Sequence, residues 1–214
     1  MTNPTERRAG ALSKDRIVKA AIDILNEDGE TALTFRALAG RLQTGAGALY
    51  WHVADKDELV AAATEGVIAG VLPSRSTGDL RDLALAVFDA VEAQPWVGAQ
   101  LSRAPWQPAV GRIFEAVGQR LQALGIAEAA QFDAASALVN YMLGAAAQPP
   151  AASGLPKDTD RAAFLAAVAA RWMRDDPAAF PFVERMKTQL RDHDDRAQFL
   201  AGIDLILAGI KAQS

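Results

Sequence analysis

Apolar residues recur at intervals of three and four along most of the chain, and no segment alternates between apolar and polar residues as a half-buried strand does. The clearest early pattern follows Ser13, the expected N-cap of a helix that ends near Gly29. The apolar positions of this helix are Ile17, Ala20, Ala21, Ile24 and Leu25. The spacing predicts an all-α protein.

Residues 33–59 predict two short helices joined by a tight turn. Thr34 is the expected N-cap of the first helix, which runs from Phe35 to Leu42. Gln43–Gly45 supplies a turn in which the glycine is expected to take a positive φ, and the second helix runs from about Ala46 to Trp51. Together with the preceding helix, this arrangement indicates a three-helix helix-turn-helix domain.

A long helix follows the helix-turn-helix pattern. Asp55 and Glu58 have the spacing of a capping box, and the apolar pattern continues to about Leu72 before the breakers Pro73–Gly78. The predicted organisation is a helix-turn-helix DNA-binding domain over residues 1–56, a linking helix over residues 55–72, and a helical regulatory and dimerisation domain over residues 73–214.

The predicted regulatory domain is rich in alanine and helical in pattern. Its clearest linker is the Pro/Gly/Ser-rich stretch Gln148–Thr159, and a kinked connection is expected at Pro177–Pro181. The expected helices are Asp79–Ala93, Trp96–Ala104, Pro108–Leu124, Glu128–Ala147, a helix after Asp160 to about Asp175, a helix from Pro181 to about Arg191, and Asp195–Ala212.

Composition narrows the class of protein. Half of the 214 residues are hydrophobic, so the chain can bury a sizeable core. Cysteine is absent, which excludes disulfides and thiolate metal sites. The first residues lack the apolar run of a signal peptide, and no segment approaches the roughly 20 apolar residues of a membrane span. We therefore expect a cytoplasmic protein without a membrane partner.

The net charge of −4 is unevenly distributed between the two predicted domains. Residues 1–56 carry a net charge of +1, which leaves −5 for the remainder. A DNA-facing surface needs only a local basic cluster. The candidates for this cluster are Arg7, Arg8, Lys14, Arg36 and Lys56. The alternative is an ordinary surface of mixed charge.

Three segments resemble the tetracycline-repressor (TetR) family of bacterial regulators. Between Ile17 and Leu59 they read I-x-x-A-A-x-x-I-L-x-x-x-G, L-T-x-R-x-L-A-x-x-L and L-Y-W-H-V-x-x-K-x-x-L. A fainter resemblance to the tetracycline-repressor branch covers Phe199–Ile210. The family resemblance as a whole implies an N-terminal three-helix helix-turn-helix domain, followed by a larger helical ligand-binding and dimerisation domain.

The expected DNA-binding face has few base-reading side chains. Gly45–Ala48 reads Gly-Ala-Gly-Ala, which cannot form bidentate hydrogen bonds to base edges, although alanine methyls can touch thymine and small residues permit close backbone approach. The resemblance places Arg36 near a guanine edge, and Thr34 and Lys56 at phosphates. The predicted DNA contacts are Thr34, Arg36, Gly45, Ala46, Gly47, Ala48, Tyr50, Trp51, His52 and Lys56.

The resemblance also implies a small-molecule effector in the second domain. Aromatic residues and one polar anchor, Asn140, are the candidates for its pocket, although each alone is more often a core residue than a ligand contact. The predicted ligand-binding residues are Trp96, Trp106, Phe114, Asn140, Tyr141, Met142 and Trp172.

Tetracycline bound with magnesium is disfavoured as the effector. Tetracycline repressors use histidines that follow the linking helix, whereas this chain has only His52 and His193. We expect a small hydrophobic effector, no metal site and no cofactor.

The final helix carries an apolar stripe with Gly202 and Gly209 beside it, where a neighbouring helix can approach closely. On pattern alone this helix could pack within one subunit or between two. The resemblance favours a homodimer, which could place two recognition helices in major grooves about 34–36 Å apart on a palindromic operator. The predicted dimer-interface residues are Phe199, Ile203, Ile206, Leu207 and Ile210.

Two other classes of function remain as alternatives. The Asp/His cluster Arg191–Asp195 could indicate an enzyme, but a charged loop before a helix explains it as well, and no Ser/His/Asp pattern, phosphate loop or H-E-x-x-H motif occurs. An effector-independent architectural DNA-binding protein would need fewer helices for dimerisation alone. The sequence therefore predicts no catalytic residues and favours a ligand-responsive transcriptional repressor.

Overall fold

The computed structural model describes residues 12–72, 79–148, 160–174 and 176–212. These residues form α-helices and one short 3₁₀ turn, with no strand among them, so the all-α prediction is confirmed. The expected breaker Pro73–Gly78, most of the Gln148–Thr159 linker, and Arg7 and Arg8 of the basic cluster lie outside the described residues.

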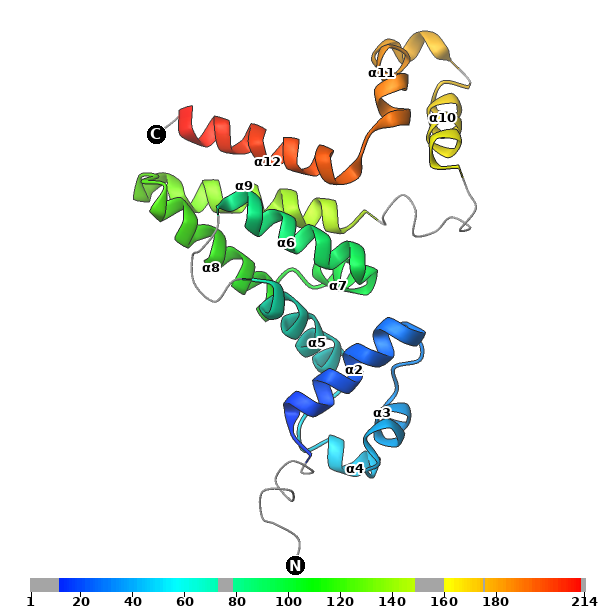
Figure 1. Cartoon of the computed structure of the whole chain (residues 1–214), viewed down its shortest axis with the longest axis vertical. Coiled ribbons are helices and arrows are strands. Elements are labelled where there is room, and N and C mark those ends of the chain that lie inside the picture. Colours follow the sequence, from blue (N-terminus) through cyan, green and yellow to red (C-terminus); the bar gives the residue numbers. More distant parts are fainter. Residues whose placement is uncertain (1–11, 73–78, 149–159, 175, 213–214) are drawn as a thin grey trace, which may run out of the picture.

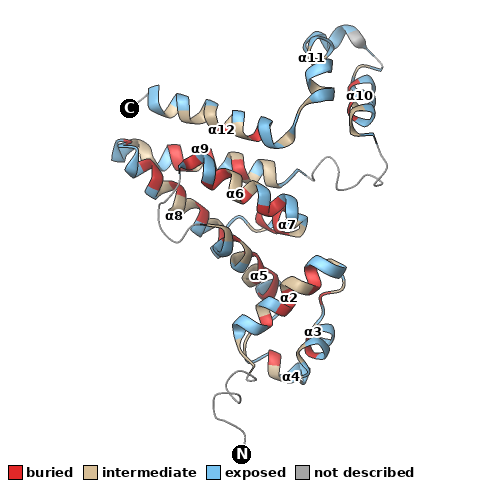
Figure 2. Ribbon diagram, viewed as in Figure 1, coloured by how far each residue is buried: buried red, intermediate tan, exposed pale blue. Residues whose placement is uncertain are grey.

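The N-terminal domain consists of α2 (Lys14–Asp28), α3 (Phe35–Leu42), α4 (Ala46–Leu49) and the start of α5 (Lys56–Val71). Their apolar faces meet in one core (Figures 1 and 2), in which the side chains of Ile17, Leu38, Leu49 and Leu59 are almost completely buried. The second helix of the pair ends at Leu49, two residues before the predicted Trp51.

In three of these helices, the side chain of the residue just before the helix accepts a hydrogen bond from an N–H of the first turn. The Ser13 Oγ accepts from the Arg16 N–H (3.3 Å), the Thr34 Oγ1 from the Ala37 N–H (3.1 Å), and the Asp55 Oδ1 from the Glu58 N–H (2.8 Å). All three predicted N-caps are confirmed. Glu58 accepts from the Ala54 N–H (2.7 Å), one residue before the cap, so the capping box is offset from its usual form.

The turn between α3 and α4 corrects one expectation. The positive φ falls on Gln43 (φ 53°), whereas Gly45 has an extended φ of −80° and serves as the N-cap of α4. Gln43 is the C-cap of α3, and its left-handed conformation turns the chain so that the following Thr44 N–H donates to the Ala39 carbonyl (3.0 Å).

The regulatory domain packs around a second core. It consists of the end of α5, α6 (Leu80–Ala93), α7 (Pro95–Arg103), α8 (Pro108–Ala123), α9 (Glu128–Ala146) and α12 (Asp195–Ala212). α10 (Arg161–Trp172), the 3₁₀ turn Pro177–Ala179 and α11 (Pro181–Asp192) form a hairpin that projects from this body (Figure 1). Leu165 and Ala169 of α10 are buried, and no described residue of α11 is.

Two glycines let regulatory helices approach closely. A Cβ on Gly98 in α7 would lie 2.7 Å from the Val91 Cγ1 and would also overlap the Ala146 carbonyl oxygen. A Cβ on Gly202 in α12 would overlap the phenol of Tyr141 on α9. The close approach expected at Gly202 therefore exists within the subunit.

Arg120 of α8 is a buried cation with incomplete hydrogen bonding. Its side chain is 4% exposed; Nη1 donates to the Ala116 carbonyl (2.9 Å), while Nε and Nη2 have no partner among the residues that the structure describes. Unsatisfied buried donors cost stability, more so when they are charged.

We expect Arg120→Met to raise the free energy of unfolding by about 1–2 kcal/mol, because the thioether side chain fills similar space without stranded donors. Urea denaturation of the variant and the parent protein measures the change. A loss of stability would instead mean that the guanidinium has a partner beyond the described residues.

Candidate functional site

The predicted DNA-facing surface is built on one aromatic stack. The rings of Phe35 in α3 and Tyr50 after α4 lie 4.5 Å apart and are nearly parallel, with an interplanar angle of 4°. Leu49 anchors α4 from below in the core. Tyr50 thus fixes the angle between α3 and α4 while its ring remains largely exposed.

The two arginines of α3 have different surroundings. Arg41 forms a bidentate ion pair with Glu27 of α2 (2.8 and 2.6 Å), and this hydrogen bonding lowers the pKa of the Glu27 carboxyl. Arg36 is exposed and makes no hydrogen bond or ion pair with any residue that the structure describes. Of the two guanidinium groups, only that of Arg36 is available for a base edge or a phosphate.

Among the described residues, no packing contact requires a glycine at Gly45, the N-cap of α4, or at Gly47 within it. A Cβ added at Gly45 or Gly47 would meet no heavy atom within 4 Å, and neither φ is positive. Gly45, Ala46 and Gly47 are exposed, and Ala48 is half-buried. This helix therefore presents bare backbone and small side chains to the outside.

We expect Gly47→Ala to leave stability unchanged or to raise it by up to about 1 kcal/mol, because alanine favours helix. We also expect a loss of operator affinity of about tenfold, because the added methyl keeps the backbone away from DNA. Denaturation and DNA-binding titrations of the same preparation separate the two effects. Gly111→Ala in α8, also exposed, is the control; equal affinities for both variants would refute close backbone approach.

The remaining predicted DNA contacts differ in their exposure and in the hydrogen bonds that they already make. Trp51 is 89% exposed and His52 is half-buried. Thr34 uses its hydroxyl as a cap, and the Lys56 Nζ donates to the Glu30 carbonyl (2.6 Å), which ties the α2–α3 loop to α5. A phosphate contact by Lys56 would use the other two ammonium hydrogens.

A cavity of about 720 Å³ opens among α6, α9, α12 and the α10–α11 hairpin. Of the predicted pocket residues, Asn140, Tyr141, Met142 and Trp172 line it. The sequence analysis missed further lining residues, including Phe88, Glu92, Phe164, His193, Asp195 and Phe199.

Three predicted pocket residues lie elsewhere, which corrects the prediction. Trp106 is 96% exposed in the α7–α8 connection. Trp96 packs between the two cores and donates from Nε1 to the Asn26 Oδ1 (2.8 Å). Phe114 packs against Phe132 at a smaller hollow of about 310 Å³ between α8 and α9.

Stacked rings form part of the cavity wall. Phe199 lies between Phe88 (centroids 4.9 Å apart) and Tyr141 (5.5 Å), with interplanar angles of 27° and 14°. The Tyr141 hydroxyl donates to the Phe199 carbonyl (3.2 Å), and burial raises the pKa of this phenol. Gly202 leaves the space that this ring occupies.

A charged cluster closes the hairpin end of the cavity. Arg161 of α10 pairs with the Asp195 carboxylate (2.5 Å) and donates to the His193 carbonyl (2.7 Å). The His193 Nε2 lies 2.8 Å from the same carboxylate, and its Nδ1 lies 2.6 Å from the Leu190 carbonyl. The Asp/His cluster thus joins the hairpin to α12.

No group of three potential metal ligands occurs among the residues that the structure describes. Within the same residues, no helix has the length and apolar character needed to cross a membrane.

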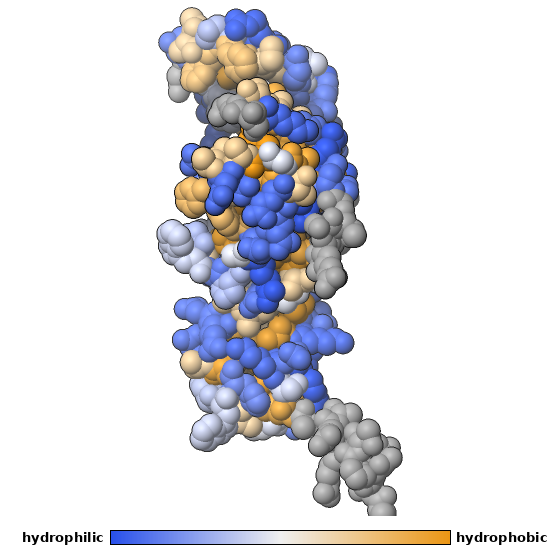
Figure 3. Space-filling view, turned by 90° about the vertical axis from the view of Figure 1, so that its left-hand side faces the viewer, coloured by the Kyte–Doolittle hydropathy of each residue, from blue (hydrophilic) through white to orange (hydrophobic). Residues whose placement is uncertain are grey.

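The predicted dimer stripe divides into two parts. Phe199 and Ile203 are buried in the core of their own subunit, so the packing alternative holds for them and corrects the prediction there. Ile206, Leu207 and Ile210 are half-buried against this core. Leu205 on the same helix is 76% exposed and was missed by the stripe. On the face to which the C-terminal end of α12 points, apolar surface gathers in the regulatory half (Figure 3).

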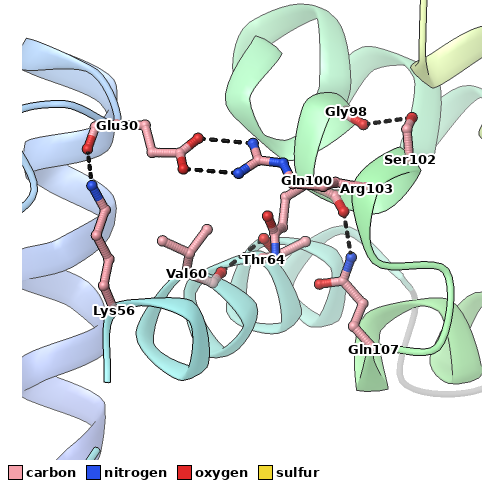
Figure 4. Close-up of polar contacts among 9 residues, drawn as sticks. All are labelled: Glu30, Lys56, Val60, Thr64, Gly98, Gln100, Ser102, Arg103 and Gln107. Carbon is pink, nitrogen blue, oxygen red and sulfur yellow. Dashed lines mark hydrogen bonds and ion pairs between the residues drawn. The ribbon is translucent and has the colours of Figure 1, made fainter. Parts of the chain in front are cut away.

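Polar contacts connect the two domains through α7 (Figure 4). Arg103, the last residue of α7, forms a bidentate ion pair with Glu30 of the α2–α3 loop (2.9 Å for both bonds), and this hydrogen bonding lowers the pKa of the Glu30 carboxyl. The Lys56 ammonium donates a hydrogen bond to the backbone carbonyl of the same Glu30. At the other end of α7, Trp96 holds Asn26.

A helix-turn-helix domain joined by one long helix to a helical domain with a ligand-sized cavity is the architecture of a DNA-binding regulator. Comparison with known proteins gives the same class. Residues 17–63 match the family model of bacterial regulatory proteins, tetR family, and residues 77–214 match that of the tetracyclin repressor-like C-terminal domain.

Individual relatives agree with the family models. An HTH-type transcriptional regulator of Saccharopolyspora erythraea is 36% identical over 139 residues, which cover 62% of this chain and 59% of that protein. The transcriptional regulator SCO7222, a TetR from Streptomyces coelicolor, is 47% identical, with a TM-score of 0.79 over 94% of this chain and 99% of that one. ActR of Streptomyces coelicolor, solved with actinorhodin, shares the fold at 24% identity, with a TM-score of 0.74 over 95% of this chain and 98% of that one. The chain belongs to the TetR family of bacterial transcriptional regulators.

Proposed function

We propose that this protein is a ligand-responsive repressor that binds a palindromic operator as a homodimer and is released by a small hydrophobic effector. The observation that carries the proposal is the position of α7. One side of α7 packs directly behind the cavity wall. Residues at both ends of α7 form hydrogen bonds to the helix-turn-helix domain.

On the side that faces the cavity, α7 packs tightly against the cavity wall. Val91 of α6 and Ala146 of α9 line the cavity, and both contact α7 at Gly98, where no Cβ fits. An effector that moves either wall residue must therefore move α7 as well, because close-packed interiors transmit displacement.

The DNA side consists of two separate ties. Trp96 donates a hydrogen bond to Asn26 near the end of α2, and Arg103 forms an ion pair with Glu30 before α3. Displacement of α7 thus shifts the α2–α3 unit and with it Arg36 and α4. In a dimer, such a shift changes the spacing of two recognition helices, which must match successive major grooves.

We expect Arg103→Ala to reduce the coupling between effector and operator by about two- to fivefold, because an exposed ion pair contributes up to about 1 kcal/mol. Coupling is measured as the ratio of operator affinities without and with saturating effector. Glu30→Gln should have the same effect, and the double variant no further effect. Arg112→Ala, which breaks an ion pair to Glu65 between α5 and α8, is the control; an equal loss of coupling there would exclude the α7 route.

Selection of bound DNA from a random pool tests the operator part of the proposal. We expect enrichment of one palindrome bound by two chains, with an affinity that falls steeply as salt rises. Binding without any enriched sequence would instead identify an architectural DNA-binding protein.

A further inference from the structure

The cavity has a chemical character that the proposed function leaves open. Five aromatic side chains line it: Phe88, Tyr141, Phe164, Trp172 and Phe199. Three of them form the continuous stack on α6, α9 and α12, and the other two come from α10, which stands apart from those helices in Figure 1. Ring faces bind flat aromatic ligands by offset stacking and attract cations through their quadrupoles.

The charge of the lining is negative. Glu92 and Asp195 contribute carboxylates, whereas lysine and arginine are absent from the described residues that line the cavity. The Asp195 carboxylate is already neutralised by Arg161 at 2.5 Å and bonded by His193 at 2.8 Å. Glu92 of α6 has no hydrogen-bonding or ion-pair partner among the described residues.

An exposed carboxylate without a partner among the described residues, on a cavity that stacked rings also line, favours a positive ligand and disfavours a negative one. Attraction between opposite charges in contact is stronger in a partly enclosed site than in bulk water, because the effective dielectric is lower there. The neutral amides of Asn140 and Gln198 add hydrogen-bonding groups without adding charge. The volume of about 720 Å³ lies within the range of pockets that take drug-sized molecules.

We infer that the effector is a flat aromatic cation whose rings stack against Phe88, Phe199 and Tyr141 and whose charged nitrogen pairs with Glu92. This inference rests on the proposed function, because it assigns the chemistry of the same effector site. It sharpens the sequence-based expectation of a small hydrophobic effector by adding a positive charge.

Three probes with one ring system test the charge. They are 9-aminomethylanthracene, 9-anthracenemethanol and anthracene-9-carboxylate, titrated into the full-length protein by calorimetry and by quenching of tryptophan fluorescence. We expect the amine to bind about tenfold more tightly than the alcohol, and the carboxylate to bind most weakly. The aliphatic 1-adamantylmethylamine should bind more weakly than the aromatic amine, because it cannot stack.

The variant Glu92→Gln keeps the shape of the site and removes the charge. In this variant the affinity for the amine should fall to that for the alcohol, while the alcohol affinity stays unchanged. Glu115→Gln, at the smaller hollow between α8 and α9, should leave all three affinities unchanged. Failure of the amine to bind, a carboxylate that binds as tightly as the amine, or an equal effect of Glu92→Gln on all three probes would overturn the inference.

The same probes separate this inference from the proposed function. If a neutral or anionic probe binds more tightly than the amine and releases the operator, the cation assignment is wrong and the repressor proposal stands. If the amine binds tightly through Glu92 while operator affinity stays constant, the cation site is supported and the proposed release mechanism is contradicted.

Discussion

Gly98→Ala should lower the free energy of unfolding by about 3 kcal/mol, a large share of the stability of a typical domain. The added methyl would meet the Ala146 backbone oxygen and would lie 2.7 Å from the Val91 Cγ1, so α7 would have to separate from α6 and α9. Ala146 is the last residue of α9, and its backbone carbonyl cannot swing away as the far end of a flexible side chain can. Urea denaturation at one protein concentration measures the change, because an oligomer's stability depends on concentration.

Gly118→Ala provides the matched control for this substitution. Gly118 also lies within a helix, but a Cβ there meets no heavy atom within 4 Å. We expect the control to be more stable than the parent protein by about 0.5–1 kcal/mol, because alanine is the better helix former. If both variants are equally stable, the tight packing of α7 against the cavity wall is incorrect.

Arg36→Ala should weaken binding to the selected operator by about 1–3 kcal/mol, which corresponds to roughly 5- to 150-fold in affinity. It should also relax the base preference at one position of each half-site. The reason is that Arg36 is the α3 arginine without a partner in the described part of the chain, while the predicted recognition helix offers only backbone and methyl groups. Fluorescence anisotropy with the operator and with random DNA of the same length measures both effects.

Arg41→Ala is the control on the same helix. Its guanidinium is occupied by Glu27, so its removal should cost much less affinity and should leave base preference intact. Equal losses for Arg36→Ala and Arg41→Ala on both DNAs would show that the contribution of Arg36 is general electrostatic attraction.

Features that depend on residues close in the chain were predictable from the sequence. Ser13, Thr34 and Asp55 cap their helices because the hydroxyl or carboxylate needs only the N–H groups of the next turn. The final helix begins at Asp195 and ends at Ala212 as predicted. The α3–α4 turn was harder, because glycine tolerates a positive φ but does not require one, and Gln43 took that conformation instead.

Features that depend on distant residues were predicted less well. The apolar stripe of α12 was visible, but which neighbour covers Phe199 and Ile203 depends on how α9 and α6 pack against them. Trp96 and Trp106 flank prolines in similar ways, yet one bridges the two domains and the other lies in solvent. The lining residues Phe88 and Glu92 of α6 and Phe164 of α10 were missed because the sequences around them carry only ordinary helical patterns. The resemblance already placed Arg36 near a guanine edge, but the reason why Arg36 and not Arg41 is available became visible only with the ion pair between Arg41 and Glu27.

The central claim is that a ligand bound in the cavity releases the protein from its operator. One titration tests this claim most directly. The selected operator, labelled for anisotropy, is bound by the full-length protein and titrated with a compound whose affinity for the cavity is known from calorimetry. We predict that the operator dissociates with a midpoint that follows the cavity affinity and that shifts with substitutions of Phe88 or Glu92. Full occupancy of the cavity with unchanged operator affinity would contradict the account.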